Sequence, residues 1–223
     1  MTAKLFVSAI AKFALGVALM GVLLFLPAGT LSWLQGWLLM GILFIPMFLA
    51  GLVMMARNPD LLRSRLNAKE KRGEQSLVVK LSGLMFLVGF ILAGLSFRFG
   101  WWQLPKWVSI LGTALFLISY ALYAEVLREN TWLSRTIEVQ ENQEVVSTGL
   151  YGVVRHPMYA VTLILFLSMP LVLGSAWCFI VFLAYPFIIA RRLLDEERFL
   201  AAELPGYAEY MQKVKWRLLP FIW

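Results

Sequence analysis

Long apolar stretches separated by short polar segments are the feature that most constrains the fold of this chain. Four stretches cover about residues 5–26, 33–56, 81–99 and 107–127, and a longer apolar region covers 158–190. A helix needs roughly 20 apolar residues to cross the hydrocarbon core of a bilayer. With 61% hydrophobic and only 15% charged residues, a soluble domain of this length could not bury its apolar surface. The sequence therefore predicts an all-α, polytopic transmembrane helical bundle.

The apolar region 158–190 is too long for one span and short for two. Gly174-Ser175 stands near its middle, with Pro170 just before it. Such breakers inside an apolar region predict a tight turn between two helices, here about 158–173 and 176–190. The bundle is therefore expected to have five to six spans, the last two forming a helical hairpin.

The charged residues fall almost entirely on one side of this predicted bundle. With a cytoplasmic N-terminus, the inside segments are 1–12, 57–80, 128–156 and 191–223. Of the 20 basic residues, only Arg98 and Lys106 lie in the outside turns, as the positive-inside rule requires. All 13 acidic residues also lie in the inside loops or at the inside ends of the spans. Both termini are therefore predicted to be cytoplasmic, and polar chemistry is expected on that side.

The same distribution excludes several functions. No acidic residue lies in the middle of a span, which argues against a proton-coupled transporter or an ion pathway. The single cysteine, Cys178, and the single histidine, His156, exclude a disulfide and a cysteine-rich or multi-histidine metal site. The net charge of +7 comes from short basic runs between apolar stretches, which is typical of membrane proteins rather than nucleic-acid binders.

Residues at the membrane boundary are expected to anchor the bundle. Lys12 lies two turns into the first span and is expected to snorkel toward the headgroups. The loop 57–80 is basic, contains a predicted helical stretch at 60–76, and is interpreted as a solvated segment that contacts lipid headgroups. Interfacial anchors are predicted at Trp33, Trp37, Trp101, Trp102 and Trp107.

Two inside segments flank the hairpin and must lie close together, because a helical hairpin returns the chain to its starting side. In the first, Pro157 suits the first turn of a helix, whose free N–H groups can receive a carboxylate or phosphate. In the second, Arg192 and Glu196 are four apart and share a helix face. We therefore divide the chain into N-terminal transmembrane helices (1–127) and a region carrying the site (128–223).

Each of these features alone has an ordinary structural explanation. Arg192 and Glu196 could form a surface ion pair at a helix end, and Arg155-His156 could cap and anchor a helix at the headgroups. Together, however, the two segments place an Arg, a His, two Tyr and a Glu around one pocket at the membrane edge. No other part of the sequence offers a comparable set.

The C-terminal motifs resemble a known superfamily. The stretch G-L-Y-G-V-V-R-H-P-M-Y ends at Tyr159, R-x-x-x-E-E-x-x-L begins at Arg192, and P-G-Y-A-E-Y ends at Tyr210. In this order they are similar to the isoprenylcysteine carboxyl methyltransferase and phospholipid methyltransferase superfamily of integral membrane methyltransferases, over about residues 138–222. Ala160 and Pro205 depart from the family pattern, which often has Gly and Phe there. The first 130 residues match only as membrane helices.

The resemblance implies S-adenosylmethionine as the methyl donor, bound at the cytoplasmic membrane edge. It implies catalytic roles for His156, Arg192 and Glu196, with Arg192 facing the methyl acceptor. The positions that it assigns to the cofactor pocket are Gln140, Gln143, Glu144, Val145, Val146, Tyr151, His156, Pro157, Met158, Tyr159 and Glu196.

Elementary chemistry is consistent with these roles. The donor carries a sulfonium, an ammonium and a carboxylate, so Glu196 can pair with its positive groups while Arg, His or free N–H groups receive the carboxylate. Tyrosine faces suit a sulfonium through cation–π attraction. Methyl transfer is an in-line displacement, which an enzyme promotes mainly by alignment and exclusion of water. The sequence has no glycine-rich Rossmann fingerprint, so the cofactor site is expected to be of another kind.

Several functions remain open at this point. The favoured acceptor is a lipid-like or prenylated molecule that is methylated on a carboxylate oxygen, and the alternatives are a phospholipid amine or a small thiol. A second class is an NADPH-dependent membrane reductase with an RH-x-x-Y-like element, although that pattern usually has Asn where Met158 stands. A third is a non-enzymatic membrane scaffold that has kept the fold.

Overall fold

The computed structural model describes residues 3–57, 59–66, 73–133 and 139–223, and these parts are helical without any strand. The elements are α1 (Ala3–Ala28), α2 (Leu34–Arg57), α3 (Pro59–Leu66), α4 (Gly73–Phe99), α5 (Lys106–Glu129), the 3₁₀ helix η1 (Gly149–Gly152), α6 (Pro157–Leu173), α7 (Ala176–Phe182), α8 (Tyr185–Glu203) and α9 (Tyr207–Lys213). The predicted all-α class is confirmed.

Five segments of the described chain are long and apolar enough to cross a membrane. They are Leu5–Ala28, Leu34–Arg57, Ser76–Phe99, Lys106–Glu129 and Ala176–Glu203. The sixth apolar helix, α6, has only 17 residues, which corresponds to about 26 Å at 1.5 Å per residue. This is slightly less than the ~30 Å hydrocarbon core. The prediction of five to six spans is confirmed.

Some predicted boundaries differ from the observed ones because hydropathy marks the apolar part of a helix rather than its ends. The helix α4 begins at Gly73 instead of residue 81, and α8 continues to Glu203 instead of ending at 190. The predicted helical stretch at 60–76 overlaps α3 and the start of α4, and its residues 67–72 lie outside the described residues.

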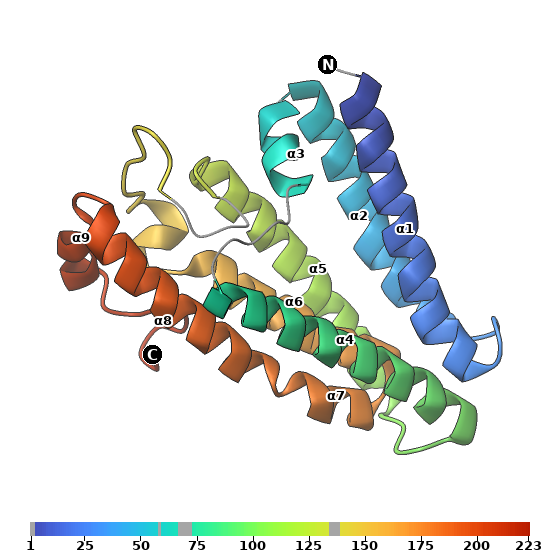
Figure 1. Ribbon diagram of the computed structural model, residues 1–223. Coiled ribbons are helices and arrows are strands. Elements are labelled where there is room, and N and C mark those ends of the chain that lie inside the picture. The colour runs from blue at the N-terminus through green and yellow to red at the C-terminus, as the bar shows by residue number, and fades with distance from the viewer. Residues whose placement is uncertain (1–2, 58, 67–72, 134–138) are drawn as a thin grey trace.

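The bundle has a turn end and a site end. At the turn end, the α4–α5 loop pairs with the turn of the hairpin, where Leu104 N donates to the Gly174 oxygen over 2.8 Å. Gly174 closes α6 in the left-handed conformation at φ 70°, and the Ser175 hydroxyl then accepts from Cys178 N at the start of α7. The predicted hairpin is confirmed. Figure 1 shows α8 and α9 on the flank of the molecule opposite α1 and α2.

The helix α6 lies at the centre of the bundle and is apolar on all sides, as expected for a buried helix. It packs tightly on α5 because Gly112 has no side chain. A Cβ at Gly112 would lie 2.7 Å from the Leu171 Cβ and 2.8 Å from the Val172 nitrogen. Such small residues allow close approach of helices in membranes.

Two predicted anchors have other roles. Trp33 is 1% exposed and stacks on Phe97, with ring centroids 5.0 Å apart. Trp33 is therefore a core residue and not the predicted interfacial anchor. Its position before α2 turns the ring inward rather than to the interface. The Lys12 ammonium donates to the Leu66 oxygen at the end of α3 over 2.8 Å, so its charge meets a helix C-terminus.

Candidate active site

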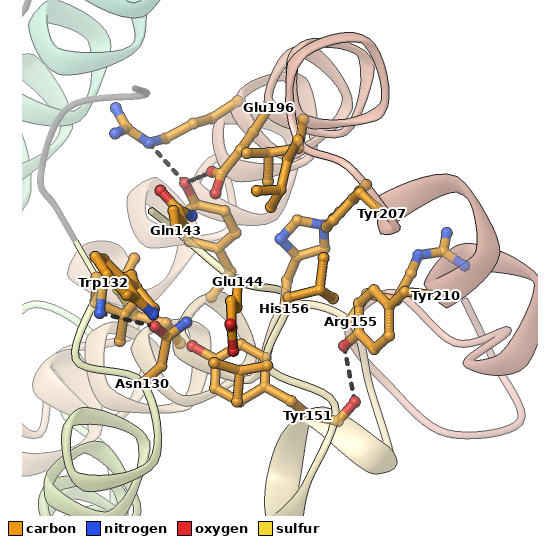
Figure 2. A pocket seen from close by; sticks show the side chains of 18 residues that line it. Asn130, Trp132, Gln143, Glu144, Tyr151, Arg155, His156, Glu196, Tyr207 and Tyr210 are labelled. Atoms are coloured by element: carbon orange, nitrogen blue, oxygen red, sulfur yellow. Dashed lines mark hydrogen bonds between the residues drawn. The ribbon is translucent and has the colours of Figure 1, made fainter. Parts of the chain in front are cut away.

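A cavity lies at the site end, where η1, α6, α8 and α9 converge (Figure 2). Its walls come from segments far apart in the sequence. The lining residues are Asn130, Trp132, Leu133, Gln143, Glu144, Val145, Val146, Tyr151, Arg155, His156, Met158, Tyr159, Arg192, Glu196, Leu200, Leu204, Tyr207 and Tyr210.

The start of α6 fixes the floor of the cavity. His156 is the N-cap residue and Pro157 occupies the first turn, where its missing N–H and fixed φ cost nothing. The preceding backbone is held by the C-terminal segment: Arg155 N donates to the Trp216 oxygen over 2.8 Å, and His156 N donates to the Arg217 oxygen over 3.0 Å. The C-terminal segment is thus a structural part of the site.

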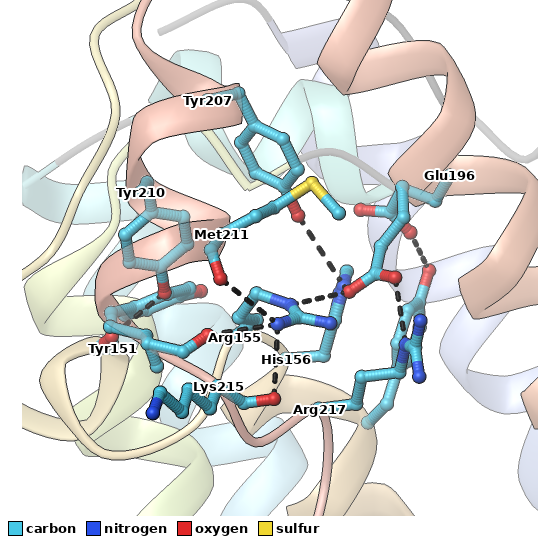
Figure 3. Close-up of polar contacts among 12 residues, drawn as sticks. Tyr151, Arg155, His156, Glu196, Tyr207, Tyr210, Met211, Lys215 and Arg217 are labelled. Carbon is cyan, nitrogen blue, oxygen red and sulfur yellow. Dashed lines mark hydrogen bonds and ion pairs between the residues drawn. The ribbon is translucent and has the colours of Figure 1, made fainter. Parts of the chain in front are cut away.

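Buried Glu197 is the centre of a polar cluster next to the cavity. Figure 3 shows the side chains of its partners Arg155, His156 and Arg217, which converge there. Arg155 Nε donates to its Oε1 over 2.6 Å, and Arg217 Nε donates to its Oε2 over 2.8 Å. His156 Nε2 lies 3.3 Å from the same Oε1. Arg155 Nη1 also donates to the carbonyl oxygens of Val214 and Lys215, over 2.9 and 3.1 Å. The buried charges are therefore paired and hydrogen-bonded, as burial requires.

A second cluster lies at the cavity wall. The Tyr159 hydroxyl donates to Glu196 Oε2, and Arg192 Nε donates to the Tyr159 oxygen over 3.0 Å. Tyr159 therefore joins the two residues that the sequence placed on one helix face. The His156 ring stacks beside Tyr159, with centroids 5.6 Å apart and an interplanar angle of 18°. Glu196, unlike Glu197, is only partly buried and lines the cavity.

Three further tyrosines complete the wall. Burial raises the pKa of Tyr151, Tyr207 and Tyr210 well above the usual value of 10, so all three stay neutral phenols near pH 7. The Tyr210 hydroxyl donates to the Tyr151 carbonyl over 2.7 Å. The Tyr151 hydroxyl is buried close to the Asn130 side chain, and both residues line the cavity.

The segment from α5 to η1 forms the remaining side. Trp132 N donates to the Asn130 side chain over 3.0 Å. The turn stabilised by this hydrogen bond brings both residues to the cavity. The Glu129 carboxylate accepts from Leu150 N over 2.9 Å and so holds η1 against α5. Gln143, Glu144, Val145 and Val146 follow as lining residues.

Ten of the residues predicted for the site therefore meet at one cavity: Gln143, Glu144, Val145, Val146, Tyr151, His156, Met158, Tyr159, Arg192 and Glu196. Two do not line it. The Gln140 side-chain amide donates to the Trp132 oxygen over 2.7 Å and so braces the loop. Pro157 is not a lining residue either, because it forms the first turn of α6 below His156.

Sequence reasoning missed several residues of the site. Glu197 stands next to Glu196 in the E-E pair, and helix periodicity alone could have shown that the two carboxylates point about 100° apart. Arg217 and the lining role of Tyr207 and Tyr210 depend on how α9 and the C-terminal segment fold back. Trp132 gave no recognisable signal in the sequence.

Comparison with known proteins agrees with this arrangement. Residues 107–204, from α5 to the start of the α8–α9 turn, match the family model described as phospholipid methyltransferase. Over these residues the chain is similar to that family. Members of the family are methyltransferases, and the resemblance of the C-terminal motifs to this superfamily is confirmed.

Two similar proteins extend the comparison. Over 128 residues the chain is 32% identical to the cobalt-zinc-cadmium resistance protein CzcN of Cupriavidus metallidurans, and the match spans 57% of this chain and 57% of that protein. The second is the structure of the eukaryotic intramembrane Ras methyltransferase, isoprenylcysteine carboxyl methyltransferase. The structural match covers 96% of this chain and 77% of the methyltransferase chain. The TM-score is 0.57 at 19% identity, so this likeness is one of fold. The chain is an integral membrane protein with that fold.

Proposed function

We propose that this protein is an integral membrane, S-adenosylmethionine-dependent methyltransferase that acts on a hydrophobic or lipid-like acceptor. The observation that carries the proposal is the cavity at the site end. It combines a carboxylate (Glu196), a cation (Arg192) and tyrosine faces at the ends of apolar helices. These are the groups that a sulfonium donor and an amphipathic acceptor require.

The residues present fit such a donor. Glu196 and Glu144 line the cavity and can receive its positive groups. The faces of Tyr151, Tyr159 and Tyr207, which stay neutral, suit a sulfonium. When bound, S-adenosylmethionine supplies an electrophilic methyl group. The chain's own residues then orient the two reactants and exclude water.

Arg192 favours a carboxylate as the acceptor. Its guanidinium lies at the cavity wall on α8, held by the Tyr159 hydroxyl, and a guanidinium pairs well with a carboxylate. A carboxylate needs no general base at neutral pH, whereas an amine or a thiol must first lose a proton. We therefore favour O-methylation of a prenylated or otherwise hydrophobic carboxylate. Phospholipid N-methylation is the second candidate, because residues 107–204 match the phospholipid methyltransferase family.

We further propose that the site end faces the cytoplasm, with both termini on that side. The support is the charge pattern, in which only Arg98 and Lys106 are basic residues of the turn end. In this arrangement the donor enters from water and the acceptor enters sideways from the bilayer. The division of the chain into N-terminal transmembrane helices (1–127) and a region carrying the site (128–223) also stays a prediction.

Binding measurements test the proposal. Titrate purified protein in detergent with S-adenosylmethionine and separately with NADPH by calorimetry, using wild type, Glu196→Ala and the control Glu203→Ala, an exposed carboxylate on the same helix. We expect the methyl donor to bind wild type and the control and to be lost in Glu196→Ala. NADPH binding alone would indicate a reductase, and binding of neither would indicate a scaffold. Transfer of a labelled methyl group into a lipid extract then identifies the acceptor class.

A further inference from the structure

Glu197 is the most completely bonded carboxylate described above, and it does not line the cavity. It is 4% exposed and lies within hydrogen-bond distance of Arg155, Arg217 and His156. A carboxylate that faces two guanidiniums stays ionised and can only accept hydrogen bonds. Its effect on a molecule in the cavity therefore passes through one of these three partners.

Two of these partners, Arg155 and His156, also line the cavity, and His156 is the one whose proton can lie on either ring nitrogen. The ring lines the cavity, and its Nε2 lies 3.3 Å from Glu197 Oε1 and 3.4 Å from the Tyr207 hydroxyl. Because Glu197 can only accept, Nε2 must carry the proton. Nδ1 is then the ring nitrogen that remains to interact with a molecule in the cavity. Hydrogen bonding at one nitrogen commonly decides the tautomer of the other.

We propose that Glu197 is a positioning residue that fixes the His156 ring with Nε2–H toward itself and Nδ1 toward the cavity. Arg217 helps to hold Glu197 in place, since it joins the C-terminal segment to the other oxygen of Glu197. The role of the cavity as a cofactor site rests on the proposed function, whereas the arrangement of the ring does not.

The contacts of Glu197 predict different effects of two substitutions on the His156 ring. Glu197→Gln places a side-chain amide, which can donate as well as accept, beside Nε2, so the neutral ring is no longer confined to the tautomer with the proton on Nε2. Arg217→Gln leaves the Glu197 carboxylate beside Nε2 and removes only the contact at its other oxygen. It should therefore keep the Nε2–H tautomer.

The sequence makes this experiment direct, because His156 is the only histidine. Protein labelled with ¹⁵N-histidine, purified through a tag without histidine, gives one pair of ring signals whose shifts report the tautomer. In wild type we expect the neutral ring to carry its proton on Nε2. Glu197→Gln should reduce the share of that tautomer. Arg217→Gln and the control Glu203→Gln, an exposed carboxylate, should keep it.

Each outcome supports or overturns the proposal. A neutral wild-type ring with its proton on Nδ1 overturns it, and so does a Glu197→Gln ring with the same share of the two tautomers as the Glu203→Gln control. If Glu197→Gln does not fold, the wild-type tautomer decides.

The test also separates this inference from the proposed function. The nuclear magnetic resonance measurements need no methyl donor, so their result stands if S-adenosylmethionine fails to bind. Where the donor does bind, Arg217→Gln should weaken its affinity about threefold to tenfold and leave the turnover at saturating donor within about twofold. A loss of turnover at saturation without a change in donor affinity would contradict a positioning role on the donor side.

Discussion

The helices α1 and α2 and the region around the cavity are built on different principles. Only 17% of the span in α1 and in α2 is buried within the protein, and many of their large apolar side chains are exposed. The buried charged groups of the described chain, Arg155 and Glu197, lie together with buried His156 at the cavity. Lipid covers the exposed apolar faces of α1 and α2, whereas hydrogen bonds within the protein pair the buried charged groups at the cavity.

This difference shows where the sequence is free to vary. An apolar face against lipid tolerates most apolar substitutions, because lipid chains adapt to the side chains that they contact. A buried ion cluster tolerates few substitutions, because removal of one member leaves the others charged and unpaired. Substitutions should therefore have large effects around Glu197, intermediate ones at tight helix contacts, and small ones in α2.

Removal of the Glu197 side chain should have the largest effect. Glu197→Ala leaves Arg155 and Arg217 near each other without a counter-charge, and we expect it to lower the free energy of unfolding by about 3–5 kcal/mol. Unfolding in mixed micelles of increasing denaturing detergent measures this value. Exposed Glu203→Ala is the matched control, with an expected change within about 0.5 kcal/mol. Equal losses in both variants would show that the ion cluster around Glu197 is no more sensitive to substitution than an exposed carboxylate.

Removal of the Arg192 guanidinium should impair the reaction more than the fold. We expect Arg192→Ala to lower the turnover number about 100-fold, because an acceptor that is not held in line with the methyl group reacts slowly. The affinity for the methyl donor should stay within about twofold. Donor titration and labelled-methyl turnover on the same preparation measure the two quantities. If both fall in parallel, Arg192 belongs to the donor side instead.

The close contact between α5 and α6 tests the intermediate case. In Gly112→Ala the new methyl group would meet Leu171 and the backbone of Val172, so we expect a loss of about 1–3 kcal/mol in the free energy of unfolding. Gly51→Ala in α2 is the matched control, because a Cβ there meets nothing within 4 Å. It should be neutral or stabilising by up to about 1 kcal/mol. A destabilised Gly51→Ala would show that α2 is packed against more than lipid.

A single hydrogen bond at the cavity should have the smallest effect. Tyr210→Phe removes the bond to the Tyr151 carbonyl but keeps the ring, and we expect a loss of about 1 kcal/mol. The same unfolding assay measures it. A loss above about 3 kcal/mol would mean that Tyr210 supports the whole fold of η1 and α9.

The spans could be predicted well from the sequence because the hydropathy of a helix shows whether lipid or water surrounds it. The hairpin followed from Gly174 and Ser175, whose local chemistry ends one helix and caps the next. The helix ends were less accurate. Polar residues such as Glu74 and Lys80 continue α4 beyond the apolar stretch, and composition alone cannot separate a polar helix end from a loop.

The candidate site was predicted only where its residues lie in a local motif. His156, Tyr159, Arg192 and Glu196 stand in short motifs on either side of the hairpin, and the hairpin brings them together. Arg217 and Tyr207 reach the site through the return of the chain after α8, and that return depends on tertiary hydrogen bonds rather than on periodicity. Trp33 was misassigned for the same reason, since its burial depends on Phe25 and Phe97.

The backbone pairing of Arg155 and His156 with Trp216 and Arg217 has a consequence for biogenesis. The last candidate span ends at Glu203, so both pairing partners follow the last membrane helix in the chain. The apolar segments that direct insertion are therefore complete without the C-terminal segment, whereas the floor of the cavity is not. A chain truncated between Glu203 and Trp216 would carry every candidate span and yet have an unfinished pocket.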